Sequence, residues 1–226
     1  MKRAILFDTE TTGLDPARGD RVIEIAALEL VGDLPTGQHY HVLVHPERDI
    51  PEEASRVHGI TLADLEGKPK FVDIADAFLE FIGEDELIAH NARFDFGFLN
   101  AELKRVQRPP LSLDRMVDTL DIARERYPGL PNSLDALCRR FSIDLSARTT
   151  HNALLDCRLL AEVYLELMGG RQRGLGLAVQ DGGTAQVSYT YDYAAQRSPR
   201  PIVPTAGELS AHARFLEKIK EPIWTG

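Results

Sequence analysis

Apolar and polar residues in the first part of the chain follow the pattern of short strands. Residues 3–8 are a mostly apolar run that ends in Asp8, and residues 21–31 and 38–45 have a strand-like composition. A short polar stretch that contains glycine, residues 32–37, separates the second run from the third, which is typical of a hairpin connection. The pattern therefore predicts three antiparallel strands at the start of the fold.

The pattern then alternates between helical spacing and short apolar runs. Ser133 is suited to begin a helix, because a serine hydroxyl can accept a hydrogen bond from a free amide of the first turn. Gly169 and Gly170 are suited to end one. A hairpin followed by alternating strands and helices predicts an α/β fold, with a mixed sheet flanked by helices. The predicted elements are a helix over 72–82, a strand over 86–89, a helix over 92–106, a strand over 116–119, a helix over 133–141 and a helix over 155–167.

The last quarter of the chain differs in composition. Residues 169–207 contain seven glycines and three prolines without a sustained period, and are interpreted as a flexible linker. A helical pattern returns at residue 208, and residues 208–226 are interpreted as a segment that docks on a partner protein. The predicted organisation is thus a domain over residues 1–168, a linker and a docking segment.

Charge and cysteine content narrow the class of protein. The net charge is −9; residues 169–226 carry seven basic and five acidic side chains, so the first 168 residues carry −11. This charge argues against a protein that coats long stretches of nucleic acid, although a carboxylate cluster can recruit metal ions that reverse the local field. Two isolated cysteines, no signal-peptide pattern and no long apolar run predict a cytoplasmic protein without a membrane segment.

Candidate chemistry begins at the end of the first strand. Asp8 and Glu10 are two residues apart, so both carboxylates lie on the same face of a strand. Two neighbouring carboxylates repel each other unless a cation joins them, and oxygen ligands suit Mg²⁺ or Mn²⁺. The Thr11-Thr12-Gly13 segment that follows could bring backbone amides close to a nucleotide. An isolated pair of this kind is more often two solvated acids beside a turn.

Two later segments contain further carboxylates and a histidine. Asp95 lies near the start of one predicted helix and Asp156 in the first turn of another, and His151 comes directly before the latter. Either acid could reach the strand edge where Asp8 lies. Taken alone, each is more often a first-turn acid that the helix dipole favours.

The order of these motifs carries a resemblance. The sequence Asp8-Thr9-Glu10, then residues 90–95 (HNARFD), then residues 151–156 (HNALLD) resembles the three motifs of DEDD-family 3′-5′ exonucleases, in the subgroup whose third motif contains a histidine. Residues 57–60, 132–138 and 148–149 are also similar to the proofreading (epsilon) subunits of bacterial DNA polymerase III. The resemblance covers roughly residues 3–168.

The resemblance implies an RNase H-like fold and a defined set of roles. It implies that His151 is the general base and that the cofactors are two divalent ions, Mg²⁺ or Mn²⁺, with a single-stranded DNA 3′ end as substrate. A histidine pKa of about 6.5 suits such a base. The implied metal ligands are Asp8, Glu10, Asp95 and Asp156, and the implied substrate-binding residues are Asp8, Thr9, Glu10, Thr12, Gly13, Glu53 and His58.

The tail carries a weaker resemblance. Gln172, Leu175 and Leu177 resemble the short segment by which proofreading subunits contact the sliding clamp, although a leucine stands where an aromatic residue is common. The apolar end that includes Trp224 would, by the same resemblance, bind the polymerase (alpha) subunit. A disordered tail is the alternative, because such a composition need not fold.

Three functions remain open from the sequence. The first is proofreading within a replicative polymerase, which the linker and docking segment favour. The second is a stand-alone exonuclease that trims RNA or oligonucleotides, and the third is a non-catalytic polymerase scaffold. Phe94, Phe96 and Phe98 could stack on bases, but helical spacing favours Phe94 and Phe98 as core residues.

Overall fold

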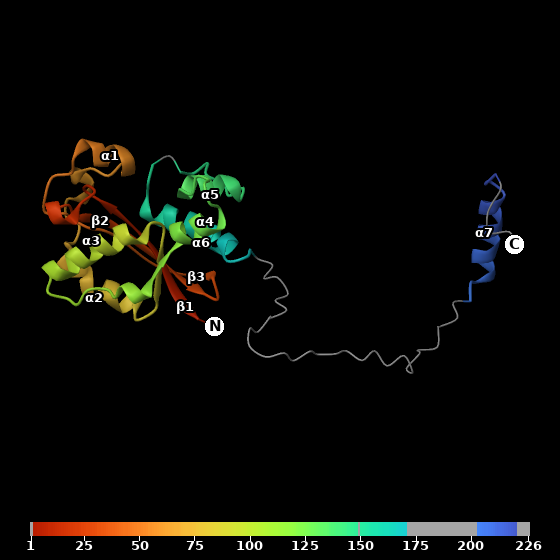
Figure 1. Cartoon of the computed structure of the whole chain (residues 1–226), viewed down its shortest axis with the longest axis horizontal. Coiled ribbons are helices and arrows are strands. Elements are labelled where there is room, and N and C mark those ends of the chain that lie inside the picture. The colour runs from red at the N-terminus through yellow and green to blue at the C-terminus, as the bar shows by residue number, and fades with distance from the viewer. Residues whose placement is uncertain (1, 149, 171–202, 221–226) are drawn as a thin grey trace. The chain divides into compact units, whose positions relative to one another are not determined.

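The computed structural model describes residues 2–148, 150–170 and 203–220, which fall into two separate units. The larger unit contains a five-stranded sheet with the strand order β3-β2-β1-β4-β5 (Figure 1). β1 (Arg3–Thr11), β2 (Val22–Val31) and β3 (Leu34–Leu43) are antiparallel neighbours, and β4 (Glu86–Ala89) and β5 (Met116–Asp118) run parallel to β1. The predicted mixed sheet and RNase H-like fold class are confirmed.

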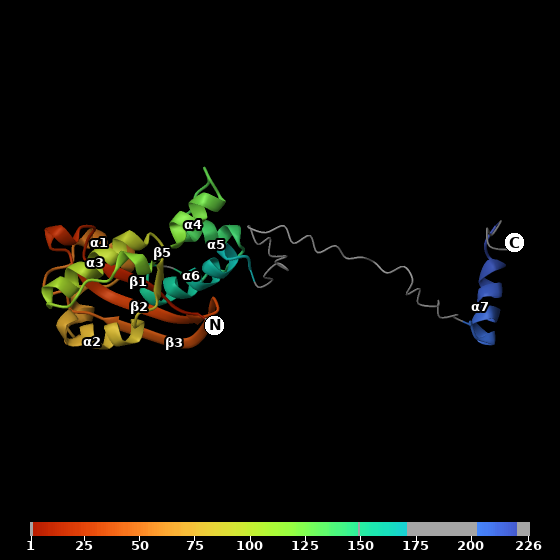
Figure 2. The same ribbon diagram turned by 60° about the horizontal axis from the view of Figure 1, so that its bottom comes forward.

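Helices cover both faces of this sheet (Figure 2). The helices of this unit are α1 (Glu52–His58), α2 (Phe71–Ile82), α3 (Ala92–Arg105), α4 (Thr119–Arg126), α5 (Leu134–Arg140) and α6 (Ala153–Leu167), with short 3₁₀ turns at Pro16–Arg18, Leu62–Leu65 and Leu113–Arg115. Alternate residues of β1 point to opposite faces of the sheet. Ile5 and Phe7 therefore pack with α2 and α3 in one core, while Leu6 packs with α4, α5 and α6 in the other.

The hairpin between β2 and β3 differs from its prediction. Residues 32–37 were expected to connect the strands, but β3 begins at Leu34 and ends at Leu43. Gly32 and Asp33 alone form the turn, with φ angles of 61° and 68°. Positive φ at both positions is what a two-residue type I′ turn requires, and this turn matches the twist of the strands. Residues 34–38 are all exposed on this edge strand, so they lack the apolar alternation by which a half-buried strand is predicted.

Two helices, α1 and α4, were not predicted from the pattern of apolar residues. α1 has seven residues, of which only His58 is buried, so it has no apolar stripe to detect. α4 begins directly after β5, where Asp118 caps it by accepting a hydrogen bond from the amide of Leu120 at 2.9 Å. Short helices of this kind depend on caps and tertiary packing more than on periodicity.

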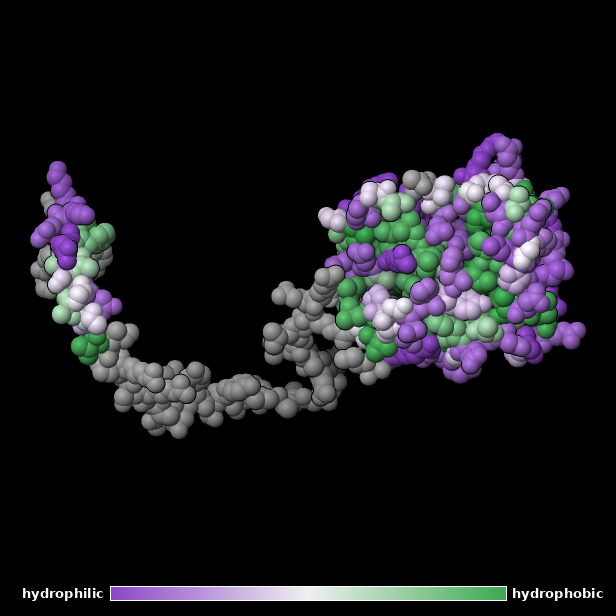
Figure 3. Space-filling model, turned by 180° about the vertical axis from the view of Figure 1, so that it is seen from behind, coloured by the Kyte–Doolittle hydropathy of each residue, from purple (hydrophilic) through white to green (hydrophobic). Residues whose placement is uncertain are grey.

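The smaller unit contains α7 (Ala206–Leu216). Thr205 and Glu208 form a reciprocal capping box, which explains why the helix begins two residues before the predicted position. Leu209 and Phe215 are exposed, and Figure 3 shows hydrophobic side chains beside hydrophilic ones on this helix. Gln172, Leu175, Leu177 and Trp224 lie outside the described residues, so their roles and the linker boundaries remain predictions.

Candidate active site

The sheet topology brings the candidate residues to one edge. β1, β4 and β5 are parallel, so their carboxyl ends meet at the same side of the sheet. Asp8 and Glu10 lie near the carboxyl end of β1, just before an irregularity of the strand pairing at Thr11. Both side chains lie on the Leu6 face of the strand, which is the face that α6 covers.

A cavity of about 770 Å³ opens at this edge. Every residue that the sequence singled out as a metal ligand, general base or substrate contact in the larger unit lines it. The lining consists of Asp8, Thr9, Glu10, Thr11, Thr12, Gly13, Leu14, Asp20, Pro51, Glu53, Ala54, Val57, His58, His90, Phe94, Asp95, Ser133, Leu134, Asp135, Arg148, His151 and Asp156.

Asp95 is brought to β1 by the start of α3. Asn91 precedes this helix in the left-handed conformation, with a φ of 65°, and its amide donates to Asp118 at 3.0 Å. One turn later the buried Asp95 carboxylate accepts from the amide of Thr9 at 3.1 Å and from the Thr9 hydroxyl at 2.7 Å. The start of α3 is therefore hydrogen-bonded to β5 through Asp118 and to β1 through Thr9. These bonds fix the orientation of Asp95.

Asp156 is positioned by the start of α6. Asn152 caps the helix by accepting from the amide of Leu155 at 3.0 Å. The buried Glu24 carboxylate of β2 accepts from the amide of Ala153 and from the Asn152 side chain, both at 3.2 Å. A carboxylate at a helix N-terminus is favoured by the free amides and the helix dipole. Glu24 thereby places Asp156 over the face of β1 that bears Glu10.

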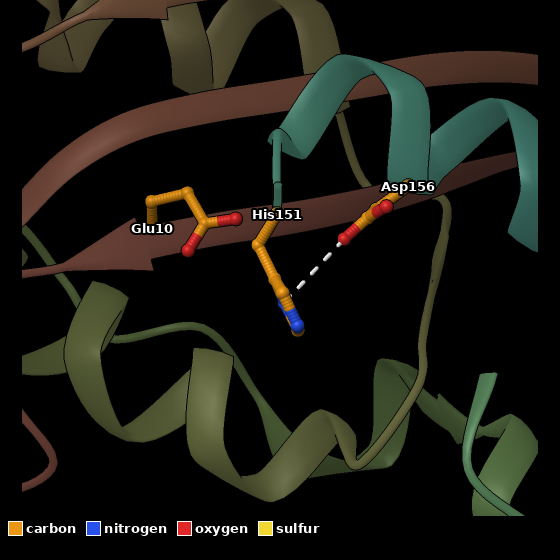
Figure 4. A group of neighbouring side chains, drawn as sticks. All are labelled: Glu10, His151 and Asp156. Carbon is orange, nitrogen blue, oxygen red and sulfur yellow. Dashed lines mark ion pairs between the residues drawn. The ribbon is translucent and has the colours of Figure 1, made fainter. Parts of the chain in front are cut away.

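His151 lies between two of the carboxylates. Its Nδ1 is 3.7 Å from Asp156, and its side chain is 50% exposed toward the cavity. Figure 4 shows the ring between the Glu10 and Asp156 side chains, with a dashed line to Asp156. One ligand atom from each of these three residues lies within 4.8 Å of the others. This is a spacing at which carboxylate and imidazole groups can share a metal ion.

Crowding of carboxylates changes their protonation. Burial, together with the negative charges of Glu24, Asp156 and Asp95, raises the pKa of Glu10 to about 8. Burial raises the pKa of Asp95 to about 7 despite its hydrogen bonds from Thr9. Burial and the charges of Asp95 and Glu10 raise the pKa of Asp8 well above its usual range. A set of buried oxygen ligands that resists joint ionisation is the donor set that divalent Mg²⁺ or Mn²⁺ fits.

Arg148 is the residue whose contacts the sequence did not predict. Its Nε and Nη2 donate to the two carboxylate oxygens of Asp156 at 2.6 and 2.7 Å, and its Nη1 donates to Asp135 at 2.7 Å. The sequence identified Arg148 only as part of a flanking segment.

The residues that follow Glu10 make hydrogen bonds and close packing contacts within the protein. The Thr12 side chain is buried, and its hydroxyl accepts from the amide of Arg21 at 3.0 Å. A Cβ on Gly13 would lie 2.3 Å from a carboxylate oxygen of Asp20. That carboxylate is held by the amide of Asp15 at 3.0 Å and by Arg48 at 2.9 Å. These contacts leave backbone atoms of the segment at the cavity wall.

The remaining predicted substrate contacts lie on α1, next to His151, whose amide donates to the carbonyl of Val57 at 3.1 Å. Glu53 and His58 both belong to α1, with Glu53 exposed and His58 buried. The Nδ1 of His58 accepts from the amide of Ile60 at 3.0 Å. Phe96 and Phe98 are core residues, whereas the half-buried Phe94 packs against Phe98 and also lines the cavity. Of the three phenylalanines, Phe94 alone retains a base-stacking option.

A model of the family described as Exonuclease matches residues 5–164. The chain belongs to this exonuclease family. Over nearly its whole length it is also similar to the epsilon subunits of DNA polymerase III. It is 47% identical to that of Rickettsia conorii, over 96% of each chain, and 40% identical to that of Escherichia coli, over 98% of this chain and 95% of the relative. The resemblance expected from the motifs is confirmed.

Solved structures place the fold in the same group. Exonuclease X in complex with a 5′-overhanging duplex DNA is 28% identical, with a TM-score of 0.58 over 74% of this chain and 91% of that one. A zinc-bound complex of E. coli exonuclease I with single-stranded DNA is 21% identical, with a TM-score of 0.65 over 76% of this chain and 41% of that one, and shows the fold alone. Among the described residues, no helix is long and apolar enough to cross a membrane.

Proposed function

We propose that this chain is a 3′-5′ exodeoxyribonuclease that releases nucleoside monophosphates from single-stranded DNA ends and proofreads within a bacterial replicative DNA polymerase. The observation that carries the proposal is the convergence of Asp8, Glu10, Asp95 and Asp156 with His151 in one cavity. The full-length similarity to epsilon subunits supports the proofreading role.

The four carboxylates are the proposed ligands of two divalent ions, Mg²⁺ or Mn²⁺. Bound there, such ions would lower the pKa of a water molecule and stabilise the charge on the phosphate and the leaving oxygen. The raised pKa values of Glu10 and Asp95 support this assignment, because a cation removes the repulsion that keeps these groups protonated.

His151 is the proposed general base. It is half-exposed and lies beside Asp156, whereas His58 of α1 is buried. A general base must reach the water that attacks the phosphate, and the exposed side of the His151 ring faces the cavity. His151→Ala should therefore lower turnover chiefly, with a smaller effect on substrate affinity.

The wall formed by Thr12, Gly13, Glu53 and His58 is the proposed seat of the terminal nucleotide. α1 and the segment after β1 line the same cavity as the carboxylates, so a strand end seated on this wall would lie beside the proposed metal ligands. A cavity of about 770 Å³ has room for a terminal nucleotide. The enzyme would accordingly act on frayed or mispaired ends.

The polymerase alpha subunit is the proposed partner of the tail. α7 exposes Leu209 and Phe215, at 55% and 60%. Phe215→Asp in the full-length protein should abolish co-purification with a polymerase alpha subunit, whereas Leu113→Asp, which alters a residue that is 61% exposed on the larger unit, should not. Equal binding by both variants would refute docking through α7. A further contact of residues 172–177 with the sliding clamp is proposed on the sequence resemblance alone.

Rates on matched substrates test the reaction. Single-stranded DNA and RNA of the same sequence, 5′-labelled, are digested with Mg²⁺. A rate at least tenfold higher on DNA is expected, and a preference for RNA would instead support a stand-alone trimming enzyme. Absence of any cleavage above that of Asp156→Ala would support the scaffold reading.

A further inference from the structure

Arg148 is a buried cation in the wall of an acidic cavity. Its side chain is 10% exposed, and its bidentate contact occupies both carboxylate oxygens of Asp156. Among the described residues that line the cavity it is the one lysine or arginine, beside seven carboxylates. Planar, bidentate pairing of this kind is the strongest common form of arginine–carboxylate contact. Arg148 therefore neutralises the acidic residue that the proposed function assigns to a metal ion.

We infer that Arg148 is a displaceable counter-cation, which holds Asp156 in the metal-free protein and releases it when a divalent ion binds. The inference rests on the proposed metal dependence. The guanidinium takes one lone pair on each oxygen of Asp156. A divalent ion that approaches the carboxylate from the same side must therefore exchange with the guanidinium, and two neighbouring cations repel each other. Arg148 would act as a positioning residue, because it acts through Asp156.

Asp135 is a second carboxylate partner for the guanidinium of Arg148. Nη1 already donates to Asp135 at 2.7 Å, and Asp135 is 38% exposed in the first turn of α5. Arg148 lies in the segment between α5 and α6, where its own amide closes a turn onto Leu145 at 2.9 Å. The guanidinium can thus keep one charged partner while it leaves the other. Displacement does not require an unpaired buried charge, which would be costly.

The same guanidinium reaches the proposed general base. Nη2 of Arg148 is 3.3 Å from Nδ1 of His151. A guanidinium only donates, so Nδ1 is an acceptor here and a neutral ring carries its proton on Nε2. In the metal-free state Arg148 therefore engages both Asp156 and His151. Its release would free both residues together.

Arg148→Met in the full-length protein tests the inference, with Mn²⁺ as the probe. Removal of the competitor should tighten Mn²⁺ binding on the order of tenfold by calorimetric titration. Removal of the counter-ion should also lower the melting temperature of the metal-free protein, because the carboxylates lose their cation. The gain in melting temperature on addition of Mn²⁺ should then exceed that of the parent chain. Arg148→Lys, which keeps a charge without the bidentate fork, should lie between the two.

Arg21→Met is the matched control. Arg21 is 11% exposed and makes the same bidentate contact, to Glu102 at 2.6 and 2.9 Å, away from the cavity lining. It should lower the melting temperature without a change in Mn²⁺ affinity. If Arg148→Met does not fold, the affinity of Arg148→Lys decides.

Mn²⁺ binding that is unchanged or weaker in a folded Arg148 variant would overturn the inference. If the parent chain binds Mn²⁺ and degrades DNA in that case, the proposed function stands and only the role of Arg148 fails. If the parent chain neither binds Mn²⁺ nor cleaves DNA, the proposed function fails first and the inference with it.

Discussion

Asp95 and Thr9 are joined by two hydrogen bonds to a single carboxylate oxygen, one from the Thr9 amide at 3.1 Å and one from its hydroxyl at 2.7 Å. Thr9 stands between Asp8 and Glu10 on β1 but points to the opposite face, toward α3. β1 therefore carries the carboxylates of Asp8 and Glu10 on one face. From its other face, Thr9 holds the carboxylate of Asp95. The Asp8-Thr9-Glu10 motif thus places its two acids on one face of the strand and the threonine that binds Asp95 on the other.

Thr9→Val tests that relationship. Valine keeps the shape of threonine but cannot donate, so we expect a loss of about 1–2 kcal/mol in the free energy of unfolding and a lower turnover. Thr9→Ser restores the donor and should recover most of the turnover. Chemical denaturation and a nuclease assay measure the two effects. Wild-type turnover in Thr9→Val would show that Asp95 does not depend on this bond.

Glu24→Ala tests the support of α6. The carboxylate of Glu24 accepts from the amide of Ala153 and from Asn152, and also bonds Nε2 of His41 at 2.7 Å. Its loss should destabilise the protein by about 2–3 kcal/mol and weaken metal binding, because the first turn of α6 carries Asp156.

Glu29→Ala on the same strand serves as the control for Glu24→Ala. Its partners, Arg3 and Thr36, lie away from the cavity lining. Stability should fall in this variant while Mn²⁺ affinity stays at the parent value. Equal Mn²⁺ affinity in both variants would contradict the positioning role of Glu24.

Gly13→Ala tests the close approach of the backbone to Asp20. The new Cβ would lie 2.3 Å from an oxygen that Asp15 and Arg48 hold in place, so the segment must shift and turnover should fall at least tenfold. Gly97→Ala in α3 is the contrasting change, since nothing lies within 4 Å of its Cβ. It should stabilise the helix by about 0.5–1 kcal/mol and leave turnover unchanged. A fully active Gly13→Ala would be inconsistent with the observed packing.

The pH dependence of stability tests the electrostatics of Glu10. Its pKa is raised from 4.5 to about 8 in the folded protein, so the folded state holds the proton more tightly than the unfolded state. The stability of the metal-free parent chain relative to Glu10→Gln should therefore be greatest below pH 4.5 and be lost as the pH rises through about 8. A change on the order of 4 to 5 kcal/mol is expected. Thermal unfolding of both proteins between pH 4.5 and 8.5 measures it.

Binding of a divalent metal ion should restore the stability that the metal-free protein loses at high pH. Mg²⁺ or Mn²⁺ at pH 8 should stabilise the parent chain more than Glu10→Gln, because an ion takes the place of the proton among the carboxylates. A relative stability that rises with pH in the metal-free protein would contradict the raised pKa.

The sheet and the site residues could be predicted from the sequence, whereas the short helix α1 and the contacts of the segment between α5 and α6 could not. Alternation on β1 placed Asp8 and Glu10 on one face, and the order of motifs brought Asp95 and Asp156 to the same edge. α1 was missed because its seven residues bury little, although it supplies Glu53 and His58. The contacts of Arg148 were also missed, since they depend on how the segment between α5 and α6 folds back onto Asp156. Such long-range pairing leaves no periodic trace in a sequence.

The most direct test is the digestion of a 5′-labelled single-stranded DNA by the parent chain and by Asp156→Asn, each with Mg²⁺ and with a chelator. We predict a ladder of products that shorten one nucleotide at a time from the 3′ end, with release of nucleoside 5′-monophosphates, in the parent chain with metal alone. Equal cleavage by Asp156→Asn, or cleavage that survives the chelator, would contradict a metal-dependent exonuclease site in this cavity.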